Sequence, residues 1–272
     1  MNNETKKPET VLIAGASRGI GLALAEQFSH HGHEIVLVSS NAQALNKAAD
    51  ELKRAYGVKV RVYACDLSRP ESPQALFDEL VSDSIKVDIL VNNAGIGSYG
   101  PFAESDSQRD LSMMQLNMVG LTLMTRLFLP SMLSRGQGRI MNVASLSGYQ
   151  PGGPGMAVYF ATKAYVLSFT RALSAELCCT GVTATALCPG PTSTAFKSRD
   201  GLENTWLYRL FQMPAEAVAK AGYRGVMAGK RAVIPGFANK FLAFAGELPP
   251  RRIALEVNRL LLKGTSKNAL FL

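Results

Sequence analysis

Tyr159 and Lys163 have the residue types and the spacing to do acid–base chemistry. They stand four residues apart in VYFATKAY, a segment that we expect to be helical. Residues at i and i+4 share one helix face, so the phenol and the ammonium group can be neighbours. A nearby positive charge favours the phenolate and lowers a tyrosine pKa from its usual value of about 10. The pair could serve as a general acid and base. In isolation, however, this spacing more often means a packed tyrosine and a solvated lysine.

A glycine-rich turn, AGASRGIG, follows an apolar run and precedes a segment with helical spacing. Its glycines are Gly15, Gly19 and Gly21. Glycine permits a tight turn and a close approach of the backbone to a ligand. The helix that follows would offer free N–H groups and the positive end of its dipole to a phosphate. In a doubly wound fold a dinucleotide lies here, so we predict nucleotide binding rather than a purely structural turn.

Apolar runs alternate with helical segments along the chain. We expect strands at residues 10–15, 34–39, 59–65, 87–92, 139–144, 182–188 and 231–235. We expect helices at residues 20–30, 41–56, 72–82, 107–134, 157–179 and 214–229. This alternation, with strands that have no polar face, predicts an α/β fold. The expected architecture is a Rossmann-type doubly wound parallel sheet of about seven strands in three layers.

The 272 residues suit one α/β domain, and no repeat or low-complexity linker divides them. We therefore predict that residues 1–272 form a single dinucleotide-binding and catalytic domain. Residues 1–9 are polar, and we expect a disordered tail there. Residues 237–272 form a C-terminal extension, in which we expect 237–263 to be less regular than the rest.

The formal charge of +8 permits an anionic partner, but no basic run with interleaved aromatic residues indicates nucleic-acid binding. The first ten residues lack the apolar segment of a secretory signal. No stretch approaches the ~18 apolar residues that a membrane span needs. We therefore expect a cytoplasmic protein.

The cysteines and histidines indicate neither a disulfide framework nor a metal site. Cys65, Cys178, Cys179 and Cys188 show no C-x-x-C spacing, so we expect four buried free thiols of a reducing compartment. The three histidines crowd into residues 30–33 without a carboxylate or cysteine cluster beside them, and we predict no metal site.

Taken in order, the motifs resemble those of the short-chain dehydrogenase/reductase family, in its single-domain branch. The glycine turn matches the pattern G-x-x-x-G-x-G, and NNAG at residues 92–95 matches the motif after the fourth strand. Pro189 and Gly190 with Thr194 match P-G-x-x-x-T after the sixth strand. The family's catalytic asparagine, serine, tyrosine and lysine match Asn117, Ser145, Tyr159 and Lys163.

The resemblance implies a role for each of these four residues. Hydride transfer to a carbonyl builds negative charge on its oxygen, which needs a hydrogen-bond donor and a proton. Tyr159 would give the proton in reduction and accept it in oxidation, while Ser145 would hydrogen-bond the substrate oxygen. Lys163 would lower the tyrosine pKa and hold the nicotinamide ribose. Asn117 would shape a helix kink and position a water that relays protons to Lys163. A strand-end cap and an ordinary mid-helix asparagine are the alternatives for Ser145 and Asn117.

The resemblance also implies a set of cofactor contacts at the strand ends. They are Gly15, Ser17, Arg18, Gly19, Ile20, Gly21, Ser39, Ser40, Asn41, Asp66, Leu67, Asn93, Ala94, Gly95, Tyr159, Lys163, Pro189, Gly190, Thr192 and Thr194. Asp66 resembles the family's adenine-contacting aspartate, although a strand-end turn also uses such a residue.

NADP(H) is favoured over NAD(H) by the residues near the expected adenosine ribose. An acidic residue at the end of the second strand would bind the 2′-hydroxyl, but that strand ends in Ser39, Ser40 and Asn41. Arg18 could pair with a 2′-phosphate. Ser40 stands where NADP-preferring relatives often carry a second arginine, and it can still donate a hydrogen bond.

Two further departures from the family pattern concern the glycine turn and the serine. Ala14 replaces the usual threonine, so one side-chain hydrogen bond near the turn is lost. Ser145 precedes Tyr159 by one residue more than is common, and the glycine-rich loop 148–155 can absorb the extra residue. Ser147 is a rival, but Ser145 holds the strand-end position.

Residues 191–213 resemble the family's mobile substrate flap. Their apolar side chains, Phe196, Trp206, Leu207, Tyr208, Leu210 and Phe211, suit an apolar substrate, because closure would exclude water. Packing against the domain or a partner subunit is an equal alternative. The segment PGMAVY and the basic tail resemble a branch of ketoacyl- and steroid-type reductases. We expect a hydrophobic ketone or a 3-oxoacyl substrate.

Partner surfaces are expected in two places. The helices at 107–134 and 157–179 resemble those through which relatives form homodimers or homotetramers. Residues 237–263 mix apolar and basic side chains, which favours core or subunit interface over a membrane surface.

The predicted function is an NADP(H)-dependent oxidoreductase acting on a carbonyl or secondary alcohol. A sugar-nucleotide epimerase also uses Tyr-x-x-x-Lys, but it usually has a G-x-x-G-x-x-G turn and a larger C-terminal domain. A catalytically weak, cofactor-sensing protein would show a broken set of four catalytic residues, and all four are present here.

Overall fold

The computed structural model describes residues 8–193, 205–248 and 250–263. Its centre is a seven-stranded sheet in the order β3-β2-β1-β4-β5-β6-β9, and all its strand pairs are parallel. The strands are β1 Thr10–Ala14, β2 Glu34–Ser39, β3 Val60–Ala64, β4 Ile89–Asn92, β5 Gly138–Val143, β6 Val182–Leu187 and β9 Ala232–Val233. The prediction of a doubly wound parallel α/β sheet is confirmed. The strand order reverses between β1 and β4, which is where such sheets bind ligands.

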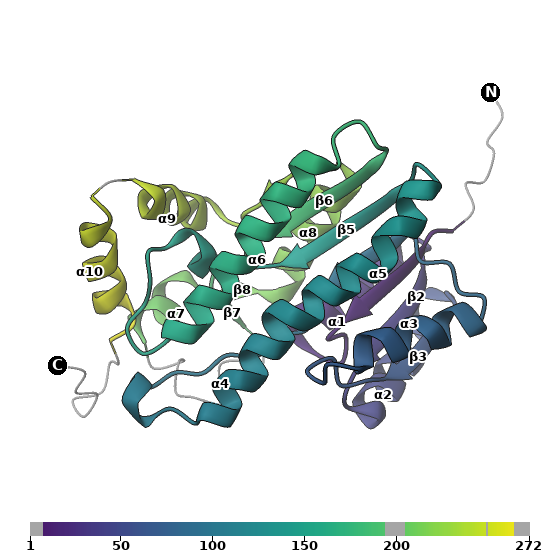
Figure 1. Ribbon diagram of the computed structural model, residues 1–272, viewed down its shortest axis with the longest axis horizontal. Coiled ribbons are helices and arrows are strands. Elements are labelled where there is room, and N and C mark those ends of the chain that lie inside the picture. The colour runs from purple at the N-terminus through teal and green to yellow at the C-terminus, as the bar shows by residue number, and fades with distance from the viewer. Residues whose placement is uncertain (1–7, 194–204, 249, 264–272) are drawn as a thin grey trace.

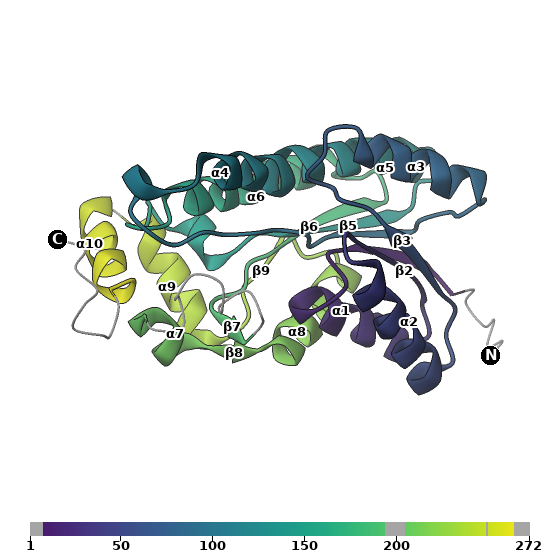
Figure 2. The same cartoon turned by 90° about the horizontal axis from the view of Figure 1, so that it is seen from below.

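Helices cover both faces of the sheet (Figures 1 and 2). One face carries α1 Gly19–His30, α2 Ala42–Tyr56 and α8 Ala215–Met227. The other face carries α3 Ser72–Ser82, α4 Ser107–Met114, α5 Leu121–Ser134 and α6 Ala157–Glu176. The bounds agree with the predicted helices to within a few residues.

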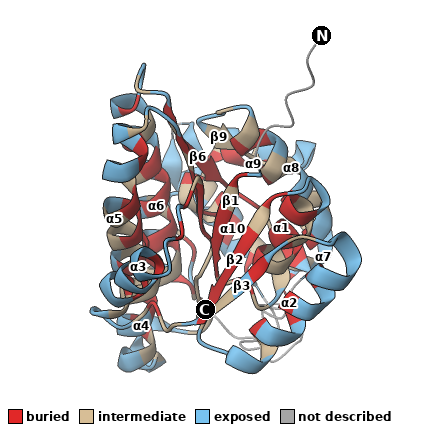
Figure 3. Ribbon diagram, turned by 90° about the vertical axis from the view of Figure 1, so that its right-hand side faces the viewer, coloured by how far each residue is buried: buried red, intermediate tan, exposed pale blue. Residues whose placement is uncertain are grey.

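The central strands are buried on both faces, which explains their lack of polar alternation (Figure 3). In β1, Val11 and Ile13 pack in the cluster beneath α1, α2 and α8. Leu12 and Ala14 pack in the opposite cluster with α3, α5 and α6. The strand ends are therefore held firmly, and the site is built on them.

The helix predicted at 107–134 is continuous, but it contains a π-helical turn at Gln115–Gly120 between α4 and α5. By length and composition this stretch is apolar enough to cross a membrane, so the expectation that no stretch approaches that limit is wrong. Here the helix contacts α3, β4 and β5, and it forms part of the layer that covers the sheet.

The C-terminal extension is more regular than predicted. It folds as α9 Phe237–Glu247 and α10 Arg251–Leu261, two helices in contact with each other. They lie at one end of the molecule with α7 Trp206–Phe211, beside the short pair β7 Thr192–Ser193 and β8 Met213–Pro214 (Figures 1 and 2). Part of the predicted flap, including Thr194 and Phe196, lies outside the described residues.

Two smaller predictions are corrected. All four cysteines are free, but Cys178 and Cys179 are exposed and Cys65 is half-buried, so only Cys188 is the buried thiol expected of all four. Glu9 was placed in the disordered tail. Its side chain is instead buried and accepts a 2.6 Å hydrogen bond from Arg139, because β1 brings it beside the start of β5.

Candidate active site

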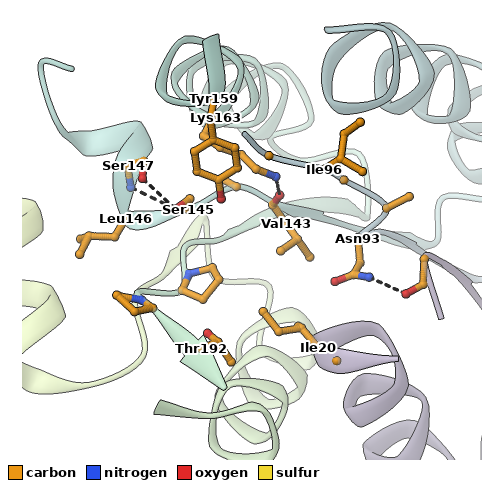
Figure 4. Close-up of a pocket in the computed structure, with 18 of the residues that line it drawn as sticks. Ile20, Asn93, Ile96, Val143, Ser145, Leu146, Ser147, Tyr159, Lys163 and Thr192 are labelled. Atoms are coloured by element: carbon orange, nitrogen blue, oxygen red, sulfur yellow. Dashed lines mark hydrogen bonds between the residues drawn. The ribbon is translucent and has the colours of Figure 1, made fainter. Parts of the chain in front are cut away.

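A cavity of about 330 Å³ opens at the carboxyl ends of the central strands (Figure 4). It is lined by most of the residues that the sequence singled out. These are Gly15, Ser17, Arg18, Gly19, Ile20, Ser39, Ser40, Asp66, Leu67, Asn93, Ala94, Gly95, Ser145, Tyr159, Lys163, Pro189, Gly190 and Thr192. Segments from distant parts of the chain thus meet at one site.

The glycine turn is closed by an asparagine of the NNAG motif. Asn93 Nδ2 donates to the carbonyl oxygens of Ala14 and Gly15, at 3.1 and 3.0 Å. Gly15 has a φ of +74°, and a Cβ there would lie 2.7 Å from Ala94 Cα. A Cβ on Gly21 would lie 2.1 Å from the Gly15 carbonyl oxygen. These glycines are needed where β1, β4 and α1 approach one another.

The N-terminus of α1 faces this turn with its backbone donors free of a side-chain cap. Arg18 occupies the N-cap position, and its side chain makes no capping hydrogen bond. The first N–H groups of a helix have no intrahelical partner, and the dipole there favours an anion. With the glycine cradle beside it, this end of the cavity fits the pyrophosphate of a dinucleotide.

The adenosine end of the cavity contains Arg18, Ser39, Ser40 and Asp66. Asp66 Oδ1 accepts hydrogen bonds from the Ser68 backbone N–H and hydroxyl, so the strand-end turn role holds beside any contact with adenine. Among the described residues no carboxylate forms an ion pair with Arg18, which leaves its charge available to a phosphate.

Asn117 is buried behind the cavity wall, inside the π-helical turn. Its Nδ2 donates to the Ile96 carbonyl at 2.9 Å and to Thr162 Oγ1 at 3.1 Å, and its Oδ1 accepts from the Ile96 N–H at 3.0 Å. The π turn thus aims one side chain at both the NNAG loop and α6. A Cβ on Gly95 would lie 3.1 Å from Asn117 Oδ1 and 3.5 Å from Lys163 Nζ, so the two side chains meet behind this glycine.

Lys163 is buried rather than solvated. Its Nζ donates to the Val143 carbonyl at 2.9 Å and lies 5.8 Å from the centroid of the Tyr159 ring (Figure 4). Burial lowers the pKa of Lys163 to about 8, while Cys188 opposes that shift. A buried amine whose pKa is lowered toward physiological pH marks a candidate functional group.

The pKa of Tyr159 reflects its buried surroundings, and a lowering of this pKa by Lys163 stays a prediction. Burial raises the pKa of Tyr159, and the hydrogen bond with the Ser145 side chain partly offsets this. The lysine ammonium donates to a backbone carbonyl at β5 and also lies over the Tyr159 ring, 5.8 Å from its centroid. Tyr159 therefore keeps its proton at neutral pH, and it can donate this proton where negative charge builds on an acceptor.

Ser145 holds the end of β5, as expected, and it caps the 3₁₀ turn Leu146–Tyr149. Its Oγ accepts from the Ser147 N–H at 3.1 Å and lies 3.3 Å from Ser147 Oγ (Figure 4). The Ser145 hydroxyl thus caps the 3₁₀ turn, and the same hydroxyl is the one expected to contact the substrate. Ser147 also lines the cavity, but the hydrogen bond to Tyr159 belongs to Ser145.

Among the described residues, three of the predicted ones do not line the cavity. Gly21 is packed beneath the turn, and Asn117 lies behind Gly95. Asn41 is the N-cap of α2, where its Oδ1 accepts from the Ala44 N–H at 2.9 Å. Thr194 lies outside the described residues.

The other end of the cavity is formed by residues that sequence reasoning missed. They include Leu146, Met156 and Phe160, and from the C-terminal helices Leu242, Asn258, Leu261 and Leu262. Leu207 and Tyr208 of α7, which the sequence placed in the flap, also line this end. Most of these side chains are apolar, so this end of the cavity suits an apolar molecule.

Hydrogen bonds to backbone carbonyls, together with the Arg171–Glu247 ion pair, attach the C-terminal helices to the domain. Tyr99 Oη donates to the Leu262 carbonyl at 2.5 Å, and Asn258 Nδ2 donates to the Gly152 carbonyl at 2.6 Å. Gln150 Nε2 donates to the Leu242 carbonyl at 2.8 Å. Near these residues in the sequence, one feature could have indicated such a contact. It is the polar residue Asn258 among the apolar residues of α10.

The family model for short chain dehydrogenases matches residues 9–204. The chain therefore belongs to this family, and it is an oxidoreductase acting on CH–OH and C=O groups. The resemblance carried by the sequence motifs is confirmed.

Individual relatives agree in fold and in length. A putative ketoacyl reductase of Streptomyces coelicolor is 35% identical over 206 residues, covering 74% of this chain and 78% of its own. A short-chain dehydrogenase from Sphingobium yanoikuyae, solved with NADPH, has a TM-score of 0.78 at 33% identity and covers 88% of this chain and 92% of its own. A bulky-bulky ketone specific alcohol dehydrogenase from Comamonas testosteroni has a TM-score of 0.73 at 28% identity, covering 87% and 90%.

Proposed function

We propose that this protein is an NADP(H)-dependent reductase of hydrophobic ketones. Compounds with a 3-oxoacyl chain are the alternative substrate class. The observation that carries the proposal is the apolar end of the cavity, which begins beside Ser145 and Tyr159 and continues to α9 and α10. A bulky ketone could place its carbonyl at these two side chains and its apolar groups among Met156, Phe160 and Leu242. The ketoacyl reductase and the bulky-ketone dehydrogenase among the relatives support the same substrate class.

The cofactor preference rests on charge at the adenosine end. Arg18 offers a guanidinium for the 2′-phosphate of NADP(H), and Ser40 offers a hydroxyl. The end of β2 carries no carboxylate that would repel this phosphate. The NADPH complex among the related structures supports the same preference.

Bound at this site, the nicotinamide would supply or accept the hydride. The protein's own residues would then manage the oxygen of the substrate. Ser145 would hydrogen-bond the carbonyl oxygen as negative charge builds on it, and Tyr159 would pass its proton to that oxygen. The raised pKa of Tyr159 keeps this proton in place at neutral pH. Lys163, held by Val143, would turn one N–H toward the ribose, and Asn117 would fix the loop and helix around it.

The test is the oxidation of NADPH and of NADH with a panel of aromatic ketones, diketones, steroids and 3-oxoacyl thioesters. A Tyr159→Phe variant should lose about 10²–10⁴-fold in kcat, because general acid catalysis contributes that much. Its affinity for NADPH should stay near that of the wild type. Tyr165→Phe is a matched control, since this tyrosine lies on the same helix but is exposed, and its kcat should not change.

Each other outcome has a defined meaning. A Tyr159→Phe variant with the wild-type rate would contradict the assigned proton donor. Turnover with NADH alone would contradict the role given to Arg18. Tight NADPH binding without turnover of any ketone would favour the cofactor-sensing alternative.

Assembly as a homodimer or homotetramer through α4, α5 and α6 stays a prediction. These helices expose large apolar side chains at Leu111, Val119, Leu133 and Tyr165, as a subunit interface would require.

A further inference from the structure

The helix α9 carries a stripe of phenylalanines that the site does not use. Phe237, Phe241 and Phe244 are 88, 66 and 62% exposed. They follow one another at i, i+4 and i+7, so they lie along one face of the helix. Leu248, just past the helix end, is exposed as well and continues the stripe. Of the predicted roles for residues 237–263, core does not apply to these side chains, whereas subunit interface stays a prediction.

The helix α10 repeats the pattern. Ile253, Val257 and Leu260 are exposed at i, i+4 and i+7, whereas Asn258 and Leu262 are buried on the opposite side. Figures 1 and 2 show α9 and α10 together at one end of the molecule. We call the two stripes, Phe237, Phe241, Phe244, Ile253, Val257 and Leu260, the C-terminal apolar surface. Large apolar side chains exposed in a row along a helix indicate an interaction site.

The charges beside this surface are positive. Lys240 lies next to the stripe of α9, and Arg251 and Arg252 follow where α10 begins. Within the described part of the chain, these three cations form no ion pair. The acidic residues of the same helices are already engaged, because Glu247 pairs with Arg171 and Glu256 with Arg259. Three unneutralised cations thus lie on the same two helices as the apolar surface, and Lys240 lies beside its stripe on α9.

The same helices also border the cavity from the other side. Leu242 of α9 and Leu261 of α10 line its apolar end. An α-helix with its side chains is about 10 Å thick, so whatever covers the C-terminal apolar surface lies close to the substrate end of the site.

We propose that the C-terminal apolar surface docks on a membrane that contains anionic lipids. The phenylalanines of α9 would enter the boundary between headgroups and acyl chains, with Lys240, Arg251 and Arg252 at the anionic headgroups. A second copy of this chain fits less well, because it would bring further unpaired cations to the contact rather than the negative charge that complements them. Docking itself does not depend on the proposed substrate. If the substrate is a hydrophobic ketone, the lipid would be its reservoir.

The experiment is sedimentation of the purified full-length protein with vesicles. One set contains phosphatidylcholine alone, and the other contains equal amounts of phosphatidylcholine and phosphatidylglycerol. We expect the protein to sediment with the anionic vesicles and to bind the neutral ones at least about tenfold more weakly, since several cations face the surface. Added salt should weaken the binding to anionic vesicles.

Two pairs of variants separate the apolar and the charged contributions. The double variant Phe241→Ser/Phe244→Ser should lose at least about tenfold in vesicle affinity. Val81→Ser, which changes an exposed apolar residue on α3, should lose none. Arg251→Gln/Arg252→Gln should lose about tenfold on anionic vesicles, and the control Lys53→Gln/Arg54→Gln, on the exposed side of α2, should stay near the wild type.

Several results would overturn the proposal. One is wild-type protein that does not sediment with anionic vesicles, and another is a Phe241→Ser/Phe244→Ser variant that binds as the wild type does. A dimer in light scattering that dissociates in the same double variant, without vesicle binding, would assign the surface to a second copy. Reduction of a water-soluble ketone by NADPH, measured alongside, should change less than about twofold in all these variants, since none of the altered side chains lines the cavity. Vesicle binding without ketone reduction would leave docking intact and reject the proposed function.

Discussion

The two ends of the cavity differ in the kind of atoms that form their walls. At the cofactor end the wall is mostly backbone, formed by the glycine turn, the NNAG loop and the N-terminus of α1, and it is held by strands buried on both faces. At the substrate end the wall is mostly side chains, contributed by helices that are joined to the domain by a few hydrogen bonds. A ligand shared by a whole family needs a constant backbone cradle. A substrate that differs among members needs a wall that can change without disturbing the sheet.

The largest expected effect comes from a substitution in the glycine turn at the cofactor end of the cavity. A Gly21→Ala Cβ would lie 2.1 Å from the Gly15 carbonyl oxygen, so the turn must move. We expect NADPH affinity, measured by fluorescence titration, to fall at least about 100-fold, together with a loss of about 1–3 kcal/mol in the free energy of unfolding.

A control separates the two effects. A Cβ on Gly225 of α8 would lie 2.2 Å from Val233 Cγ2, so Gly225→Ala is comparably crowded but remote from the cofactor. It should destabilise the protein and leave NADPH affinity unchanged. Equal losses of affinity in the two variants would mean that the turn has no special role.

The next effect concerns the choice of cofactor. Arg18→Ala should weaken NADPH binding by about 10–100-fold, because a charge-assisted pair with the 2′-phosphate contributes about 1.5–3 kcal/mol. The affinity for NADH, titrated in the same preparation, should hardly change. A parallel loss for both cofactors would place Arg18 at the pyrophosphate instead.

A pH titration probes the lysine between the two ends. The pKa of Lys163 is about 8, below its ordinary value, so the ammonium loses its proton as the pH rises through that value. The ribose contact proposed for Lys163 then loses a charged donor, and NADPH affinity should fall several-fold between about pH 7 and about pH 9. Binding to Lys163→Met should be weaker and flat over this range. The same slope in both proteins would assign the titration to another group.

The smallest effect belongs to the substrate end. Tyr99→Phe removes the hydrogen bond to the Leu262 carbonyl and costs about 1 kcal/mol. We expect α10 to be held less firmly and the KM for a bulky ketone to rise about threefold, with NADPH affinity unchanged. Tyr56→Phe, at an exposed position on α2, serves as the control. A loss of NADPH affinity in Tyr99→Phe would show that the two ends are not independent.

The same contrast explains what the sequence could predict. The strands, the glycine turn and the four residues Asn117, Ser145, Tyr159 and Lys163 carry local signals, since apolar runs and short spacings are visible in the chain itself. The fold and the family were predicted from them and are confirmed. The structure brings these four side chains to the cavity wall or just behind it, while their chemical roles stay predictions.

The features that the sequence missed depend on contacts between distant segments. Nothing near Leu262 indicates that its carbonyl meets Tyr99, 163 positions away along the chain. The pKa of Tyr159 depends on burial and on the Ser145 side chain, and Lys163 Nζ donates to the Val143 carbonyl. Spacing on a helix specifies neither contact. The family resemblance implied a helix kink at Asn117, but the apolar residues of 107–134 predicted one α-helix and did not indicate the π turn.

The most direct test of the central claim follows the hydride itself. NADPH carrying deuterium at both C4 positions would be incubated with the protein and a bulky aromatic ketone. The mass of the alcohol formed would then be measured by mass spectrometry. We predict that each product molecule gains one deuterium, and that product formation nearly disappears with Tyr159→Phe. An alcohol without deuterium, or equal formation by the variant, would contradict hydride transfer assisted by this tyrosine.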